Sequence, residues 1–240
     1  MPPVESLWVY LAERPLLWLT LTVGAYVAAH RLYRGFGELA ILNPVLVSVV
    51  LIIAVLRLSG TDYATYFEGA QFVHFLLGPA TVAIAVPLYR QSQELRRLWR
   101  PLTAALLAGS LTAVLSALGL GWLLGLDQAT LLSLVPKSVT TPVAMGIAEQ
   151  VGGLPSLTAV LVILTGVVGA VAGLPLLAVL GIREATARGL AMGVAAHGIG
   201  TARAFQSSER AGAFSGLGMG LNAALTALLV PLLLYLLKLV

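Results

Sequence analysis

Long apolar runs separated by short polar loops are the feature that most limits how this chain can fold. A helix needs about 20 mostly apolar residues to cross the roughly 30 Å hydrocarbon core of a bilayer. Runs of that length cover residues 15–33, 39–58, 71–89, 101–125, 131–150, 155–180, 189–206 and 212–238. We therefore expect an all-α polytopic membrane protein with about seven or eight transmembrane segments, some of them re-entrant.

The composition favours lipid over water as the surrounding solvent. Of the 240 residues, 59% are hydrophobic and 10% are charged, and the mean hydropathy is +0.96. Soluble domains carry about 25% charged residues and about 45–50% apolar ones. So few charges cannot cover a water-exposed surface. We expect one integral membrane domain over residues 1–240, with the lipid bilayer around it.

Charge and cysteine content exclude several classes of protein. The formal net charge is +4, but the basic residues lie at the ends of the apolar runs, so we expect no nucleic-acid partner. The absence of cysteine excludes disulfides, thiolate metal sites and cysteine nucleophiles. No metal-ligand motif and no phosphate-binding loop occurs, so we expect no metal, no cofactor and no catalytic residue. Lys137 beside Ser138 is a poor Ser–Lys dyad, because adjacent helical positions do not face each other.

Arginines in the short loops give an orientation for the first segments. Arg31 and Arg34 follow the first run, and four arginines crowd the loop after the third run: Arg90, Arg96, Arg97 and Arg100. Both loops fall on the same side if every run up to there spans, so we expect this side to be cytoplasmic and the amino terminus to lie outside. The polar stretch 60–70 is expected to form an interfacial helix or a plain surface loop.

The sequence PKSVTTP, residues Pro136 to Pro142, interrupts one of the apolar runs. Proline removes a backbone donor and clashes with the preceding turn, so a helix through residues 131–150 is expected to break here. In hydrocarbon, freed backbone groups are costly unless protein or water satisfies them. Such a break is tolerable only where it lines a cavity or packs inside a bundle. Lys137 supports the same conclusion, because an ionisable residue inside a membrane marks a functional site by default.

A break of this kind favours the binding of an anion. The half-helix that starts after the break exposes unpaired N–H groups and the positive end of its dipole. Ser138, Thr140 and Thr141 add hydroxyl groups, and Lys137 adds a full positive charge. We predict that these four residues bind a small carboxylate. The alternative is that the prolines and hydroxyl residues only kink and pack membrane helices.

A second proline-containing segment matches the first. The stretch GPATVAIAVPLY, residues 78–89, aligns with VPKSVTTPVAMG, residues 135–146, and places Thr81 opposite Ser138. Corresponding interrupted segments in two parts of a chain point to a transporter site built from discontinuous helices, related by an internal repeat. Thr81 is therefore a further candidate for substrate binding. An inverted repeat needs antiparallel segments, so either one segment is re-entrant or the symmetry mate lies elsewhere.

Residues 192–206, MGVAAHGIGTARAFQ, form a third candidate region. Its small residues let backbones approach closely, and the glycines of the GIG stretch allow the chain to unwind. His197 titrates near neutral pH, and Arg203 carries a permanent charge suited to a carboxylate. On a helix, His197 and Thr201 share a face, while Arg203 lies well round from it. We predict substrate binding by these three residues; the alternatives are helix packing for His197 and a membrane-surface anchor for Arg203.

Three further polar residues lie at or near the predicted crossings. Asn43 precedes a proline, which again breaks a helix, so Asn43 is expected to face the same cavity and to bind substrate. Glu149 and His197 are the candidates for coupling a proton or ion to transport. Glu149 is alternatively the counter-ion of Lys137 or a membrane-edge residue. Asn222 is expected to pack between helices.

Six motifs of the chain, taken in order, resemble the LrgB/CidB family of bacterial membrane proteins. The motifs are LNPVLVS, GPATVAIAVPLY, PKSVTTPVAMGIAEQVGG, ILTGVVGAV, AAHGIGTARAF and SGLGMGLN. They are long, and the likeness covers nearly the whole chain. The resemblance implies an antiholin-like protein or murein-hydrolase regulator, linked to cell lysis and paired with a smaller LrgA-type membrane protein.

The resemblance also implies transport. The family is similar to the relevant half of the plastid glycolate/glycerate translocator, and bacterial relatives are implicated in pyruvate movement. All three substrates are short hydroxy- or keto-carboxylates, which agrees with the predicted anion pocket. We expect a multi-pass carrier of small monocarboxylates in the bacterial cytoplasmic (inner) membrane, and no enzyme; the alternative is a regulator of a pore-forming LrgA-type partner. A homodimer is expected, because 240 residues leave little chain to scaffold a moving bundle.

Overall fold

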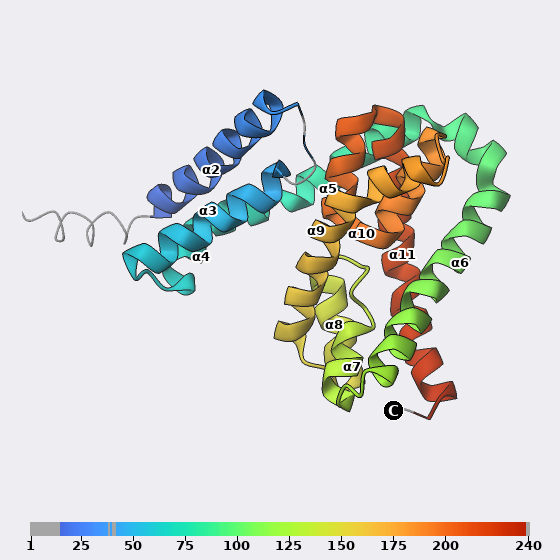
Figure 1. Cartoon of the computed structure of the whole chain (residues 1–240). Helices are drawn as coiled ribbons and strands as arrows, with labels where there is room; N and C mark the ends of the chain where they lie inside the picture. The colour runs from blue at the N-terminus through green and yellow to red at the C-terminus, as the bar shows by residue number, and fades with distance from the viewer. Residues whose placement is uncertain (1–14, 38, 40–41, 239–240) are drawn as a thin grey trace, which may run out of the picture. The chain divides into compact units, whose positions relative to one another are not determined.

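The computed structural model describes residues 15–37, 39 and 42–238, and the helices labelled in Figure 1 are its regular elements. The chain forms two compact units, one that ends at Ala83 and one that begins at Ile84. Because the elements in the described residues are all α-helices, the predicted all-α class is confirmed for this part of the chain.

The amino-terminal unit contains α2 (Pro15–Gly35), α3 (Pro44–Ser59) and α4 (Tyr63–Phe75). α2 packs against α4 through the buried Trp18, whose ring meets Tyr66 edge-on with 5.9 Å between the ring centroids. Asn43 Oδ1 accepts hydrogen bonds from the backbone N–H groups of Val45 (2.9 Å) and Leu46 (3.3 Å). Asn43 is therefore the N-cap that starts α3.

The run 71–89, which the sequence predicts to be a single span, is divided in two. α4 ends at Phe75, and α5 (Leu77–Arg90) begins two residues later. The interruption therefore lies just ahead of Pro79, which falls in the first turn of α5, where a proline fits better than in a helix interior. α5 then continues without a break through Pro87, so the segment that matches PKSVTTP in sequence does not share its interruption.

Three helices of the carboxy-terminal unit are long and apolar enough to cross a membrane. They are α6 (Ser92–Leu123), α9 (Pro155–Val179) and α11 (Glu209–Leu236). In the amino-terminal unit, α3 is apolar but has only 16 residues. The described residues thus supply fewer full-length candidate spans than the sequence predicts, and two of the predicted spans turn back on themselves instead.

The first of these is a helical hairpin made of α7 (Gln128–Leu134) and α8 (Thr141–Val151). The chain leaves Ser133 near the end of α7 and returns to it just after α8, where Leu154 N donates a hydrogen bond to Ser133 Oγ (2.7 Å). Residues 135–140 connect the two helices, and we call them the first tip. The predicted break within PKSVTTP is confirmed.

The second hairpin is α10 (Ala185–Ser207), whose backbone is non-helical at Ala196 and His197, the second tip. Its two halves run in opposite directions along α11. Along the first half of α10, the residue numbers of the contacted positions in α11 increase. Gly189 lies against Ala211, Gly193 against Ser215 and Val194 against Asn222. Along the second half, the residue numbers of the contacted positions decrease. Gly198 lies against Met219, Thr201 against Ser215 and Phe205 against Gly212. Residues 189–206 therefore do not form one continuous span but reverse at their centre, which makes this run one of the re-entrant segments.

The two hairpins start from opposite ends of α6, a helix about 48 Å long at 1.5 Å per residue. At the carboxyl end of α6, a Cβ added to Gly121 would lie 2.5 Å from the Leu131 side chain of the first hairpin. At the amino end, Arg210 pairs with both Glu94 of α6 and Glu184, which precedes the second hairpin. The hairpins therefore point toward each other inside the bundle of α6, α9 and α11 (Figure 1).

The first tip is surrounded by apolar side chains. Val135 and Val139, two of its six residues, are each 1% exposed. They belong to a buried cluster drawn from five helices and the tip: Val114, Leu118, Leu131, Leu132, Val135, Val139, Ala144, Ile147, Val151, Val162, Val230 and Leu234. The tip is thus neither an unbroken helix on the outside of the protein nor a surface loop.

Close helix packing gives the first testable prediction. A Cβ added to Gly193 would overlap the backbone carbonyl of Ser215, whereas one added to Gly119 of α6 has no atom within 4 Å. We expect Gly193→Ala to lower the free energy of unfolding by about 1–3 kcal/mol through overpacking. Gly119→Ala should leave it unchanged or raise it, because alanine favours a helix. Thermal unfolding in detergent, followed by tryptophan fluorescence, tests both, and equal melting temperatures would contradict the close packing.

Candidate functional site

The first tip brings a lysine and a serine into the interior through a tight turn. Val139 N donates a hydrogen bond to Pro136 O (3.2 Å), which closes the turn around Lys137 and Ser138. Pro142 occupies the first turn of α8, where a missing backbone donor carries no cost. Ser138 is 7% exposed and Lys137 is half-buried. The prolines therefore begin and end the turn and leave the polar residues between them.

The start of α8 supplies uncapped backbone donors next to this turn. Thr140 is the N-cap residue with an extended backbone (φ −62°, ψ 144°), but its side chain makes no capping hydrogen bond. Thr141 follows it, and both threonines are half-buried. An uncapped helix start attracts anions through its N–H groups and its dipole. Four of the predicted binding residues, Lys137, Ser138, Thr140 and Thr141, are thus brought together.

Lys137 has no carboxylate within salt-bridge distance in the described part of the chain, where the ion pairs involve Arg90 and Arg210 instead. Glu149 is exposed on α8 and does not pair with Lys137. The interpretation of Glu149 as the lysine's counter-ion is therefore not supported. A positive charge in an apolar surrounding is costly, and an anionic ligand would reduce that cost.

The second tip is formed by His197, whose backbone adopts φ 42° and ψ −133°. This region is rare for residues other than glycine and costs about 1–3 kcal/mol, so the surroundings must hold it. His197 Nε2 lies 2.9 Å from Val162 O of α9, a hydrogen-bond distance. Gly166, one turn further along α9, leaves room for the ring, since a Cβ there would lie 2.8 Å from His197 Cε1. The imidazole is buried at 4% exposure.

Thr201 fastens the second tip to α11. Its Oγ1 donates a hydrogen bond to His197 O (2.8 Å) and lies 3.0 Å from Ser215 Oγ. Arg203 is half-buried farther along the returning half, and its Nη1 donates to Gln206 Oε1 (3.0 Å). The structure thus brings Thr201 to His197. Arg203 lies six residues beyond His197, about 9 Å from it along the helix axis and toward the base of the hairpin.

Both tips meet at one buried side chain, Asn222 of α11. Asn222 Nδ2 donates a hydrogen bond to Ser138 O of the first tip (3.3 Å) and another to Val194 O, just before the second tip (3.1 Å). Its Oδ1 accepts hydrogen bonds from Ser110 Oγ of α6 (2.5 Å) and from Thr226 Oγ1 (3.3 Å). The candidate functional site is therefore the region where the two tips converge on Asn222.

Asn222 was expected only to pack between helices, and neither Ser110 nor Gly166 was a predicted site residue. An asparagine in a run of 27 residues as apolar as 212–238 needs several partners, and that requirement was the available signal. The reversal of α10 decides which backbone carbonyls become the partners of Asn222. The hydrophobic periodicity of the sequence does not reveal that reversal. Within the described residues, no group of three His, Cys, Asp or Glu side chains could hold a metal ion.

Two predicted binding residues belong to the amino-terminal unit. Asn43 uses its side-chain oxygen to cap α3. Thr81 lies in α5, and its side chain is outside the described part of the structure. Their roles in substrate binding stay predictions.

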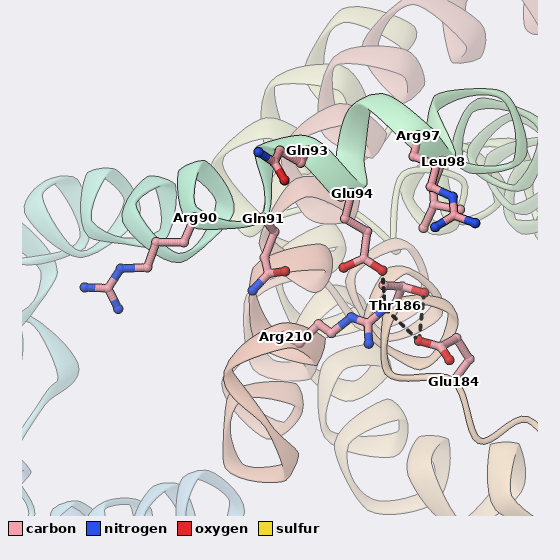
Figure 2. Close-up of a pocket in the computed structure, with 9 residues that line it drawn as sticks. All are labelled: Arg90, Gln91, Gln93, Glu94, Arg97, Leu98, Glu184, Thr186 and Arg210. Atoms are coloured by element: carbon pink, nitrogen blue, oxygen red, sulfur yellow. Dashed lines mark hydrogen bonds and ion pairs between the residues drawn. The ribbon is translucent and has the colours of Figure 1, made fainter.

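A polar cavity of about 580 Å³ lies at the amino ends of α6, α10 and α11 (Figure 2). It is lined by Arg90, Gln91, Gln93, Glu94, Arg97, Leu98, Glu184, Thr186 and Arg210. The carboxylates of Glu94 and Glu184 point at the guanidinium of Arg210, which pairs with both, at 3.2 Å in the case of Glu184. These ion pairs tie the base of the second hairpin to α6 and α11.

The Arg210 pairs give a second prediction. The pair of Arg210 with Glu94 is less exposed (side chains 42% and 23%) than the pair of Arg90 with Glu209 (67% and 57%). A double-mutant cycle with Arg210→Ala and Glu94→Ala should give a coupling energy of about 1 kcal/mol, the upper range for accessible pairs. The matched cycle for Arg90 and Glu209 should give a value near zero. Thermal or denaturant unfolding measures both, and a larger coupling for the exposed pair would contradict this ranking.

Comparison with known proteins identifies the family of this chain. The family model described as the LrgB-like family matches residues 22–236. The chain is 38% identical to the uncharacterized protein YxaC of Bacillus subtilis, over 92% of this chain and 96% of the relative. It is 30% identical to the antiholin-like protein LrgB of Bacillus subtilis, over 90% and 94%, and 29% identical to the holin-like protein CidB of Staphylococcus epidermidis, over 92% and 96%. No solved structure matches the chain. With a family match over nearly its full length and motifs that form both hairpin tips, the chain belongs to the LrgB-like family.

Proposed function

We propose that this protein carries small monocarboxylates, of the pyruvate, glycolate and glycerate class, across the bacterial cytoplasmic membrane. The observation that carries the proposal is Lys137, a half-buried cation without a carboxylate partner among the described residues, in a turn between two half-helices. A carboxylate bound there would neutralise the lysine and accept hydrogen bonds from the start of α8. Thr140 and Thr141 would contribute hydroxyl donors.

The opposed hairpins suggest how such a site becomes accessible from each side in turn. Each hairpin closes the route to the tips from one end of α6, because their bases lie at opposite ends. A movement of one hairpin opens the site to one side while the other hairpin keeps the opposite side closed. This is alternating access around a site near the middle of the membrane, as in transporters built from broken helices. The arrangement also makes the second hairpin the candidate symmetry mate of the first.

His197 is the residue we propose for coupling a proton to transport. It is buried at the second tip, and its ring nitrogen contacts a backbone carbonyl of α9. A histidine changes charge between about pH 5 and 8, so protonation would add a positive charge beside the bound anion. Glu149 is exposed and is the weaker candidate.

A second candidate function follows from the names of two relatives, holin-like and antiholin-like. In this alternative, the chain regulates a pore-forming partner of the LrgA type and transports nothing by itself. Proteoliposomes that contain only this chain separate the two functions. Uptake of labelled pyruvate, glycolate or glycerate under a pH or sodium gradient supports the carrier, and uptake only after a partner protein is added supports the regulator.

The third prediction concerns the lysine. Lys137→Ala should reduce carboxylate uptake at least about tenfold, because a hydrogen bond to a charged group contributes roughly 1.5–3 kcal/mol. Lys238, the other lysine of the chain, lies near the end of the described residues, and Lys238→Ala is the matched control that should transport normally. Equal insertion of both variants is checked by extraction and size-exclusion chromatography. Normal uptake by Lys137→Ala would rule out the first tip as the anion site.

The fourth prediction concerns the histidine. His197→Gln keeps a hydrogen-bonding side chain but cannot take up a proton. It should lose most of the stimulation by an inward proton gradient, while exchange of labelled for unlabelled substrate at equal pH continues. His30→Gln in α2 is the control and should keep the response to the gradient. If His197→Gln responds to the gradient as the unmodified protein does, His197 is not the coupling residue.

A further inference from the structure

Asn222 is tied to three other segments of the fold through its side chain alone. It is 1% exposed, and its four hydrogen bonds reach α6, the first tip, the first half of α10 and the next turn of α11. A primary amide has two N–H donors and two acceptor lone pairs. Every one of these is used, so the side chain is held in one orientation.

The two sides of the amide face chemically different partners. The NH₂ side faces the carbonyls of Ser138 and Val194, which can only accept hydrogen bonds. The oxygen side faces the hydroxyls of Ser110 and Thr226, which can donate or accept. The carbonyls alone therefore determine which way the amide points. The oxygen side joins α11 to α6 through Ser110, and the NH₂ side joins α11 to the two tips.

Both carbonyls belong to interruptions in helices. Ser138 lies in the turn between α7 and α8, and Val194 precedes the reversal of α10. A broken helix leaves carbonyls that need a new donor, and in an apolar interior that need is strong. One NH₂ group serves both tips at once. A displacement of either tip away from α11 removes one of the two acceptors of this group and allows the amide to rotate away from the other.

We propose that Asn222 is a positioning residue that couples the two tips, so that a rearrangement at His197 is transmitted to the turn that holds Lys137 and Ser138. This inference rests on the proposed function for its consequence in transport, but the coupling itself is a property of the fold. It is a role for a residue that touches no substrate. Asn222 acts through the backbone of both tips.

The coupling can be measured without transport, because the natural chain has no cysteine. Thr140→Cys places a single thiol at the first tip. Thr201→Val loosens the second tip by removing the hydrogen bonds to His197 O and Ser215 Oγ. With Asn222 present, Thr201→Val should raise the rate of thiol modification at position 140 at least about threefold, as expected within one hydrogen-bond network. In an Asn222→Ala background, Thr201→Val should add no further increase.

A rate of thiol modification that Thr201→Val does not change would overturn the coupling. An equal increase with Asn222 present and in the Asn222→Ala background would also overturn it. Either result leaves the carrier hypothesis intact, because uptake by the cysteine-free protein tests that hypothesis separately. Conversely, a protein that moves no carboxylate yet shows the coupled thiol rates would refute the carrier and keep the coupling.

Asn222→Asp supplies a second measurement in case Asn222→Ala does not fold. An aspartate carboxylate has no donor and would face two carbonyl oxygens, whereas the neutral acid can donate one hydrogen bond. As the pH is lowered, the thiol rate at position 140 should therefore fall more steeply than it does with Asn222 present, where only the thiolate fraction of the cysteine changes. Uptake should rise over the same range, relative to the protein with Asn222. Gln150→Glu makes the same amide-to-acid change at an exposed position and should keep the pH profile of the unmodified protein. An Asn222→Asp profile that also matches the unmodified protein would refute the positioning role.

Discussion

Hydrogen bonding of backbone groups at two interrupted helices is the constraint on which the rest of this structure depends. Both interruptions lie among apolar side chains, where an unpaired carbonyl is expensive. The first is served by Asn222, and the second by Asn222 and Thr201. Because the same amide satisfies both, the two tips have to meet at one level of α11. The arrangement of the hairpins and the long helices around them follows from that requirement.

Close approach of helices makes this meeting possible. Gly166 on α9 leaves space for the ring of His197, and Gly193 lets the second hairpin lie against the backbone of α11. Larger side chains at these positions would push the tips away from Asn222. These two glycines thus mark contacts between helices, and the short distances there allow the polar contacts at the tips. Lys137 is different, since its surroundings offer it apolar side chains and no carboxylate among the described residues.

Several features were predictable from local chemistry, and several were not. The interruption at Pro136 was predictable because proline cannot donate to the preceding turn. The start of α3 at Asn43 follows from the same kind of local preference. The cap uses the side-chain oxygen of Asn43, and its expected role at a binding cavity stays a prediction. The matching segment at Pro79 was predicted to be interrupted and is helical, since a proline in a first turn is harmless. Similar residues in sequence therefore gave different structures according to their place in a helix.

By itself, the sequence determined that the chain is helical and apolar, that it breaks within PKSVTTP, and that a lysine and three hydroxyl residues lie at that break. These are consequences of composition and of the covalent structure of proline, which act locally. Only the tertiary structure decided that residues 189–206 turn back at His197, that the two hairpins enter from opposite ends of α6, and that Asn222 joins them. Those features depend on which distant carbonyl meets which donor, and hydrophobic periodicity is the same for a helix that crosses and for one that reverses.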